Sequence, residues 1–263
     1  REALRKLDID EAQLDRGGYN IDTTFDKDRM KAAEKAIKTL PQDQPEGMQA
    51  GLVSIDPDDG GIEAFYGGKN YLDQAFNAST QSHVQAGSTF KPFALVAGLE
   101  NGVRLTDSYP GASPTTLNND GTPWEVNNFA GTSYGPVSLL KATQSSINTA
   151  YAALNVQVGP EKTVDVAERA GLSPNCTDKE KASGDTGGCS IDLTKNPSNV
   201  LGTPSVKPID MASAYATFAA NGVHHETHSI KKVTKGAEDE EVYEAETKGK
   251  RVFDKAVGAE TSY

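Results

Sequence analysis

The stretch Gly87-Ser88-Thr89-Phe90-Lys91-Pro92-Phe93 places a serine and a lysine three residues apart, where a run of apolar residues begins. One helical turn separates Ser88 from Lys91, so we expect both side chains on the same face of a helix. A serine hydroxyl becomes an effective nucleophile when a neighbouring base takes its proton, and a neutral lysine amine is such a base. The stretch therefore predicts a buried helix, ending near Asn101-Gly102, with a nucleophilic serine in its first turn.

Lys91 has to lose its proton near neutral pH to act as this base. Free lysine titrates near about 10.4, and each unit of pKa depression corresponds to about 1.36 kcal/mol. A helix dipole contributes at most about 2 kcal/mol, whereas full burial lowers a lysine pKa by about 3 to 5 units. We therefore expect Lys91 to be buried.

The Ser-x-x-Lys spacing alone is not specific, because it also occurs at Ser138–Lys141 and Ser229–Lys232. Ser138 opens an ordinary amphipathic helix pattern. Ser229 lies in a strand-like stretch, where an offset of three places side chains on opposite faces. Only Ser88 combines the spacing with the start of a buried helix.

A second polar element, Ser146-Ile147-Asn148, lies at the junction of two predicted helices, residues 137–144 and 149–156. A hydroxyl at this point is suited to pass a proton between Lys91 and a leaving group, and the Asn148 amide to hold a substrate amide or the lysine. Serine and asparagine are also good helix caps, so a capping role is the alternative. Ser173-Pro174-Asn175 has the same spacing and is typical of a turn.

The composition indicates a protein with an acidic surface, since the 263 residues carry a net charge of -11. We expect no nucleic-acid partner. No apolar run reaches the roughly 18 residues needed to cross a bilayer. Residues 1–18 (REALRKLDIDEAQLDRGG) are charged and end in two glycines, which predicts a linker or peripheral helix leading from an upstream region.

Cys176 and Cys189 lie in a polar, glycine-rich stretch and predict a small disulfide loop in an oxidising compartment, with two free thiols as the alternative. We expect no metal site and no cofactor. The turn Asp56-Pro57-Asp58-Asp59-Gly60-Gly61 lacks a calcium-loop pattern, and residues 224–228 (HHETH) do not have the His-Glu-x-x-His spacing.

Turn signals and periodicity predict several further elements. A strand is expected at residues 19–25, and a β-hairpin at 50–55 and 62–66 around the acidic turn. Helices are expected at residues 26–40, 161–170 and 208–221. Residues 71–85 are expected to be polar and 103–135 to form a long irregular loop. Residues 236–250 (GAEDEEVYEAETKGK) are expected to form a solvated hairpin or a flexible loop.

The chain resembles the transpeptidase domain of class A penicillin-binding proteins. The similarity is carried by GSTFKPF at residues 87–93, by Ser146-Ile147-Asn148, and by four longer stretches in the same order along the chain. These are GLVSIDPDDGGIEAFYGG (51–68), FNASTQSHVQAGSTFKPF (76–93), WEVNNFAGTSYGPVSLLKATQSSINTA (124–150) and LGTPSVKPIDMASAYATFAANGV (201–223). The match runs from about Tyr19 to Phe253, so residues 19–263 are assigned to this domain and residues 1–18 to a linker.

This resemblance implies an α+β fold, with an antiparallel sheet flanked by helices on both faces. It implies that Ser88 is acylated, that Lys91 is its base, that Ser146 relays a proton and that Asn148 orients substrate, with Trp124 as a further substrate contact. Part of the oxyanion hole is then the Ser88 backbone N–H. The implied substrate is the D-Ala-D-Ala end of a peptidoglycan stem peptide, and β-lactams are implied to acylate the same serine. The implied setting is the extracytoplasmic face of a bacterial membrane, beside an upstream glycosyltransferase domain.

The sequence departs from the family pattern at its third motif, Lys-Thr-Gly or a close variant on a strand beside the nucleophile. No such tripeptide occurs, and Lys162-Thr163 leads into Val164 in a helical pattern. We therefore expect the C-terminal part of the domain, bearing that motif, to be missing and to act as a partner segment. Two alternatives remain: a D,D-carboxypeptidase or β-lactamase that uses water as acceptor, and a non-catalytic wall-binding domain.

Overall fold

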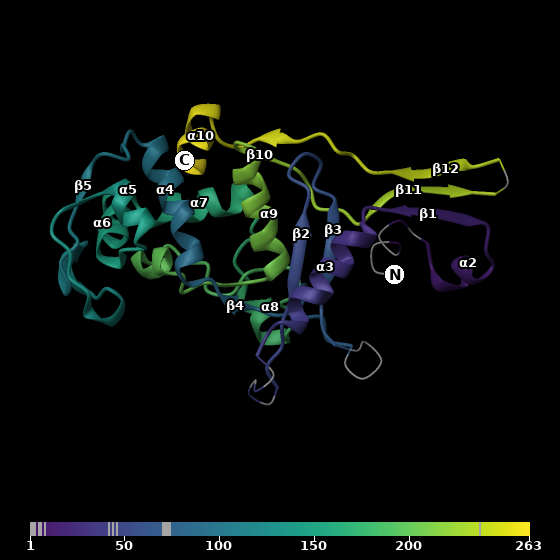
Figure 1. The fold of residues 1–263 in the computed structure, drawn as a ribbon, viewed down its shortest axis with the longest axis horizontal. Helices are drawn as coiled ribbons and strands as arrows, with labels where there is room; N and C mark the ends of the chain where they lie inside the picture. The colour runs from purple at the N-terminus through teal and green to yellow at the C-terminus, as the bar shows by residue number, and fades with distance from the viewer. Residues whose placement is uncertain are drawn as a thin grey trace.

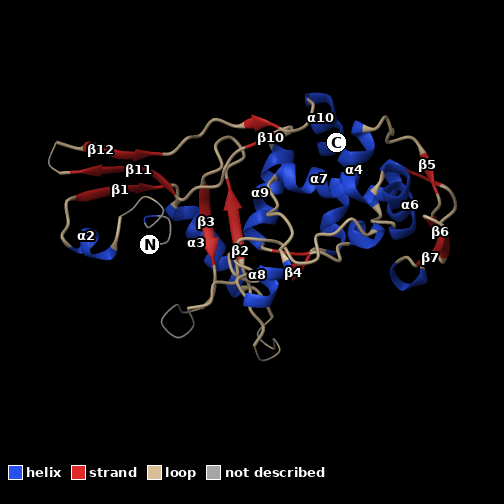
Figure 2. Ribbon diagram, turned by 180° about the vertical axis from the view of Figure 1, so that it is seen from behind, coloured by secondary structure: helices blue, strands red, loops and turns tan. Residues whose placement is uncertain are grey.

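The computed structural model describes residues 4, 7, 9–41, 43, 45, 47–69, 75–236 and 238–263. The molecule is elongated, as Figures 1 and 2 show. A helical half lies at one end, a β-ribbon crosses the middle and a small sheet extends at the other end. No helix in these described ranges is both long enough and apolar enough to cross a membrane.

The helical half is built around α4 (Lys91–Glu100), which is apolar on all sides. Phe93 and Val96 are completely buried, and α4 contacts helices on several sides. The surrounding helices are α5 (Leu139–Gln144), α6 (Asn148–Val158), α7 (Pro160–Ala170), α9 (Pro208–Ala219) and α10 (Lys255–Ser262). The predicted buried helix after Ser88 is therefore confirmed as the centre of the main core.

The β-ribbon in the middle consists of antiparallel strands β2 (Leu52–Ile55) and β3 (Ile62–Tyr66). Helix α3 (Lys27–Lys38), capped by Asp26, packs against β3, while α9 packs against β2, so the ribbon lies between helices (Figure 1). The predicted hairpin and both helices are confirmed. The α+β class with antiparallel strands and helices on both sides is confirmed as well.

The small sheet pairs β1 (Tyr19–Thr23), β11 (Ile230–Lys235) and β12 (Glu240–Glu244) antiparallel, in the order β1-β11-β12. Leu4 and Ile9 pack with Ile230 and Val233 in a second, smaller core beneath it. Within residues 1–18, α2 (Glu11–Asp15) forms part of this end of the molecule, while residues 1–3, 5, 6 and 8 lie outside the described residues. Strand β12, which lies in the charged segment 236–250, forms a hairpin with β11. A hairpin was one of the two predictions for this segment.

Residues 103–135 are not one irregular loop as predicted. They contain a hairpin of β6 (Thr115–Asn119) and β7 (Thr122–Val126), joined by Asp120 and Gly121 at φ 47° and 86°. Two consecutive positive φ angles match a type I′ turn, for which Asp-Gly is a preferred pair. Asp120-Gly121 therefore indicates a hairpin in the sequence. The prediction of an irregular loop was wrong because β6 is rich in threonine and asparagine, which are also common in loops.

Shorter elements complete the fold. They are η1 (Gly87–Phe90), η2 (Phe129–Gly131), α8 (Asp178–Ser183), η3 (Pro197–Leu201), and the two-residue strands β4 (Val84–Gln85), β5 (Ser108–Tyr109), β8 (Val137–Ser138), β9 (Ser205–Val206), β10 (Val223–His224) and β13 (Lys250–Arg251). The helix predicted at residues 137–144 begins at Leu139, because Val137 and Ser138 pair with β5 instead. Of the predicted polar segment 71–85, residues 71–74 lie outside the described residues.

Candidate active site

Ser88 and Lys91 come together on a tightened first turn. Residues of η1 form a 3₁₀ turn that continues into α4, and the Lys91 N–H donates to the Ser88 carbonyl. Side chains three residues apart eclipse each other in a 3₁₀ turn, more closely than in an α-helix. The Lys91 Nζ lies 3.1 Å from Ser88 Oγ as a result.

The Lys91 amine lies beneath the surface among oxygen atoms. Lys91 is 4% exposed, whereas Ser88 and Ser146 are exposed to solvent. Besides Ser88 Oγ, its Nζ meets Ser146 O at 2.8 Å, Ser146 Oγ at 2.9 Å and Asn148 Oδ1 at 2.7 Å. The predicted burial of Lys91 is confirmed, and it lowers the pKa of Lys91 from 10.5 to about 8.

The acceptors around Lys91 fix where its hydrogens point. The Ser146 carbonyl and Asn148 Oδ1 can only accept, so each takes one N–H of the amine. One position on nitrogen remains for the hydroxyls of Ser88 and Ser146. In the neutral amine this position is the lone pair, directed at the proton that a base has to take.

Ser146 is held by the end of helix α5. The Ile147 N–H donates to the Ala142 carbonyl at 2.9 Å and the Ser146 N–H to the Thr143 carbonyl at 3.1 Å. These two bonds form a Schellman motif, whose left-handed position usually holds glycine. Ser146 occupies that position with φ 50°. The sharp turn directs its hydroxyl at Lys91, at a conformational cost that glycine would avoid.

Asn148, the first residue of α6, is oriented by a backbone carbonyl. Its Nδ2 donates to the Asn127 carbonyl at 3.0 Å, which leaves Oδ1 to face Lys91. The next residue, Asn128, is buried and bonds Gly111, Thr132 and Thr149, which fixes this loop. Sequence reasoning missed Asn127 because a main-chain carbonyl carries no residue-type signal.

The turn that carries Ser88, η1, is supported from a distant part of the chain. Strand β4 pairs with β9, and the Gly87 N–H donates to the Gly202 carbonyl at 3.0 Å. A Cβ at Gly202 would overlap the backbone of Gly87, so only glycine fits this approach. Ser88 itself donates no backbone bond to another main-chain group in the described ranges, while the neighbouring Gly87 and Thr89 N–H groups are both bonded.

Cys176 and Cys189 are joined by a disulfide next to this support. The Cys176 N–H donates to the Ser190 carbonyl at 2.7 Å, and Ile191 and Ser205 exchange two backbone bonds of 2.8 Å. Ser205 pairs in turn with Gln85, three residues before Ser88. The disulfide loop therefore connects through hydrogen bonds to β4, the strand that precedes Ser88.

The other predicted candidates lie on other elements than Ser88. Trp124 is half-buried on β7, and its role in binding substrate stays a prediction. Ser138 caps α5, accepting the Lys141 N–H at 3.2 Å. The Thr163 hydroxyl donates to buried Asn155. In the acidic turn, Asp56 and Asp59 accept backbone N–H groups of the turn itself.

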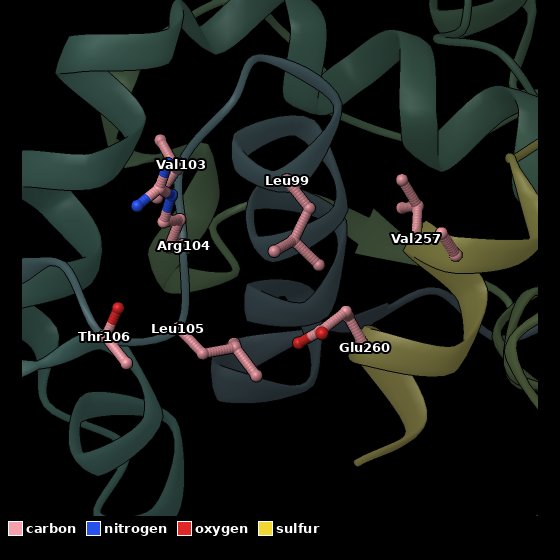
Figure 3. Close-up of a pocket in the computed structure, with 8 residues that line it drawn as sticks. Leu99, Val103, Arg104, Leu105, Thr106, Val257 and Glu260 are labelled. Atoms are coloured by element: carbon pink, nitrogen blue, oxygen red, sulfur yellow. The ribbon is translucent and has the colours of Figure 1, made fainter.

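A cavity of about 410 Å³ lies at the opposite end of α4 (Figure 3). Leu99, Val103, Leu105 and Val257 line its apolar wall, and Arg104 and Glu260 flank it. Leu99 follows Lys91 by eight residues, which corresponds to roughly 12 Å along a helix. This cavity is therefore separate from the Ser88 site.

The geometry defines a serine–lysine site for acyl transfer. An exposed hydroxyl has a buried amine beside it, a second hydroxyl shares that amine, and an amide completes the group. Such a set supplies a nucleophile, a base and a proton path for attack on a carbonyl.

Comparison with known proteins agrees with this class. The family model described as "Penicillin binding protein transpeptidase domain" matches residues 50–261. Penicillin-binding protein 1A of Mycobacterium tuberculosis is 37% identical over 252 residues, and that of Mycolicibacterium smegmatis is 35% identical over 268 residues. These alignments cover 94% and 97% of the chain but 29% and 32% of the two relatives, so the chain spans about three tenths of their length.

Solved structures give the same result. The PonA1 protein from Mycobacterium tuberculosis, in complex with penicillin V, aligns with TM-score 0.81 and 34% identity over 98% of this chain and 66% of that chain. Penicillin-binding protein A of M. tuberculosis, at 20% identity and TM-score 0.75, shows the same fold. The chain belongs to the penicillin-binding protein transpeptidase family.

Proposed function

We propose that this chain catalyses D,D-transpeptidation of peptidoglycan stem peptides through an acyl-enzyme on Ser88. The observation that carries the proposal is the 3.1 Å approach of a buried lysine amine to the hydroxyl of Ser88. The family membership supports the reaction class. The same serine is proposed to be acylated by β-lactams, since the similar PonA1 protein was solved in complex with penicillin V.

In the proposed first step, neutral Lys91 takes the Ser88 proton while Oγ attacks the carbonyl of the penultimate D-Ala. The backbone N–H of Ser88 is available to stabilise the oxyanion, because no main-chain group in the described ranges accepts it. As the C–N bond breaks, the proton passes from Lys91 through the Ser146 hydroxyl to the departing D-Ala amine. The Ser88 ester remains.

In the proposed second step, the amine of a neighbouring stem peptide attacks this ester. Its proton passes through the Ser146 hydroxyl to Lys91, which donates a proton to Ser88 Oγ, so that Ser88 leaves as the free alcohol and Lys91 is neutral again. Asn148, held by the Asn127 carbonyl and by Lys91, is positioned to orient the amide of the substrate. Trp124 is proposed as a more distant substrate contact.

The open edge of the β-ribbon supports a proposal about the sheet. The Phe65 N–H contacts Met30 Sδ, so it points away from β2. Phe65 lies opposite Val53 in the antiparallel pair. Opposite residues of such a pair either both bond each other or both point outward, so the Val53 backbone points away from β3. The Asp56 N–H donates to Gly61 of the ribbon, so the Ile55 backbone faces outward too. We propose that this edge accepts a further antiparallel strand, and that such a strand carries the missing third motif.

The cellular setting is also proposed from the family. Residues 1–18 are proposed to lead from an upstream region containing a glycosyltransferase domain. The domain is proposed to act at the extracytoplasmic face of the bacterial membrane, where stem peptides are available.

Labelling with a fluorescent penicillin, followed by peptide mapping, tests the proposal. We expect a single labelled peptide containing Ser88 and complete loss of labelling in Ser88→Ala. The matched control is Ser138→Ala, which has the same Ser-x-x-Lys spacing but only caps α5, and which keeps its label. Equal loss in both variants contradicts the assignment. Rapid release of hydrolysed penicillin, in place of a long-lived adduct, indicates a β-lactamase instead.

A further inference from the structure

The ring of Tyr151 lies beside the Lys91 amine. Tyr151 belongs to α6, three residues after Asn148, so both side chains project from the same face of the helix. Its ring is completely buried, and the Lys91 Nζ lies 5.6 Å from the ring centroid. This distance is within the roughly 6 Å over which a cation is attracted to an aromatic face.

The hydroxyl of Tyr151 fixes the ring in place. It lies 2.6 Å from Thr143 Oγ1, which is also 2.9 Å from the Leu139 carbonyl. The carbonyl can only accept, so the single Thr143 hydroxyl proton is donated there and Tyr151 donates to Thr143. Thr143 also accepts the Ser146 N–H through its carbonyl. The ring is thereby tied to the turn that places Ser146.

No carboxylate balances the charge of Lys91 in the described ranges. The charged groups of α7 lie at the other end of α4, where Arg169 pairs with Glu100 and Lys162 bonds Asn101. On α9, Tyr215 donates to the Thr89 carbonyl, and burial raises its pKa, so it stays neutral. Burial also raises the pKa of Tyr151 to about 12. Apart from the hydrogen-bond acceptors of Lys91, the described group that presents negative charge density to its protonated amine is therefore the face of the Tyr151 ring.

We propose that Tyr151 is a positioning residue for the acyl-transfer reaction: its ring holds the Lys91 amine beside Ser88 and Ser146 by attracting the protonated form. Burial favours loss of the proton and the ring favours its retention. The two effects together keep Lys91 able both to take the proton of Ser88 and to hold it until the leaving amine accepts it. This inference rests on the proposed function.

The variants Tyr151→Phe and Tyr151→Leu separate the ring from the hydroxyl. Tyr151→Phe keeps the ring but frees Thr143, whereas Tyr151→Leu removes the ring and keeps an apolar environment. We expect the pKa of Lys91 to fall by about half a unit to one and a half units in Tyr151→Leu, and to stay near the wild-type value in Tyr151→Phe. Thr143→Val, which breaks the same hydroxyl bond from the other side, is expected to match Tyr151→Phe.

The Lys91 pKa is measured directly by NMR titration of its ¹³Cε resonance, and in parallel from the pH profile of penicillin acylation. A purely structural role for Tyr151 lowers the acylation rate at all pH values without moving the Lys91 titration. Pentafluorophenylalanine at position 151 provides a second test that keeps the shape of the ring, because fluorination withdraws charge from its face. It is expected to lower the Lys91 pKa as Tyr151→Leu does.

The inference is overturned if the Lys91 titration is the same in wild type, Tyr151→Leu and the pentafluorophenylalanine protein. Failure of the proposed function looks different. In that case wild-type Ser88 takes no penicillin, while the NMR titration still reports whether the ring acts on Lys91.

Discussion

At the scale of single residues, the site depends on the protonation of Lys91. The amine is mostly neutral only when the pH is above the pKa of Lys91. Desolvation lowers the pKa of Lys91 to about 8, and no ion pair in the described ranges opposes it. The amine is surrounded by acceptors instead of carboxylates. The protonation of Lys91 therefore changes with the pH of the solution around pH 8.

We expect the acylation rate of Ser88 to rise with pH, to reach half of its plateau near pH 8 and to level off above it. Below this pKa, the neutral fraction of Lys91 falls about tenfold for each pH unit. The rate at pH 6 is therefore roughly a hundredth of the plateau value. Stopped-flow acylation with a chromogenic β-lactam between pH 5.5 and 9.5 measures this dependence. A flat profile across pH 6 to 9 contradicts the role of Lys91 as base.

Stability follows the same titration with a defined sign. The folded-state pKa of Lys91 is about 8 and the ordinary value is 10.5, so between these values the unfolded chain binds the additional proton. The free energy of unfolding therefore rises with pH in this window. The folded protein has lost the proton of Lys91 and no longer buries a charge, whereas the unfolded chain still keeps that proton. Urea unfolding at pH 7.5 and 10, compared with Lys91→Met, isolates this contribution. An equal pH dependence in both proteins argues against it.

Ser146 should show a conflict between stability and activity. A non-glycine residue in the left-handed region costs about 1 to 2 kcal/mol, partly offset by the larger unfolded-state entropy of glycine. We expect Ser146→Gly to raise the free energy of unfolding by about 0.5 to 1 kcal/mol and to slow acylation by about 10² to 10⁴. Urea unfolding and labelling kinetics measure the two effects.

The control for Ser146→Gly is its neighbour Ser145, which has φ -103° and no need for glycine. Ser145→Gly is expected to lower stability and to leave acylation close to wild type. If Ser146→Gly is destabilised as much as Ser145→Gly, the strain at Ser146 is not significant.

At the scale of elements, short segments far apart in sequence hold the turn η1, which carries Ser88. The bonds from residues 174–176 to 189–191, then to 205–206 and 84–85, form a continuous series leading to Ser88. His83, just before β4, also contacts the Cys189 carbonyl at 2.8 Å. The disulfide loop is thus connected to the same series.

Reducing the Cys176–Cys189 disulfide should destabilise the fold. Opening a loop of this length costs about 3 kcal/mol in the chain-entropy model, because the unfolded chain gains freedom. Urea unfolding with and without a reductant measures the change, and alkylation of the native, unreduced protein counts free thiols. Two alkylated thiols before reduction rule out the disulfide, and an unchanged unfolding midpoint after reduction rules out its contribution.

At the scale of the whole molecule, the two-stranded ribbon of β2 and β3 has an open backbone edge within the described residues. Helices α3 and α9 cover it, yet the Val53 and Ile55 backbones face an edge that no strand in the described ranges pairs with. Unpaired strand edges favour addition of another strand. The helical half, in contrast, has a continuous buried core around α4.

Hydrogen exchange tests whether this edge receives a strand. In the 263-residue chain we expect fast exchange at Val53 and Ile55 and slow exchange at Phe65, which α3 covers. A longer chain or an added peptide that supplies an antiparallel strand should slow both amides, raise the melting temperature and speed penicillin labelling. A peptide N-methylated along its pairing edge is the control. Slow exchange at both amides and full reactivity in the 263-residue chain alone contradict the proposal.

The amino-acid sequence determined the local features of this protein. Ser88 and Lys91, the helix after them, the hairpin around the acidic turn and the glycine-ended helices all follow from spacing within a few residues. The hairpin at Asp120-Gly121 was also readable and was missed. Such features depend on neighbours in the chain, so backbone sterics and periodicity suffice to predict them.

Only the tertiary structure determined how the site is assembled. Lys91 meets Ser146, Asn148 and the Tyr151 ring across more than 50 residues of chain, and the Asn127 carbonyl joins them from a further segment. The pKa of Lys91 depends on this packing, because desolvation requires atoms from several elements at once. A main-chain carbonyl and a buried ring carry no motif, so their roles become visible only when the chain is folded.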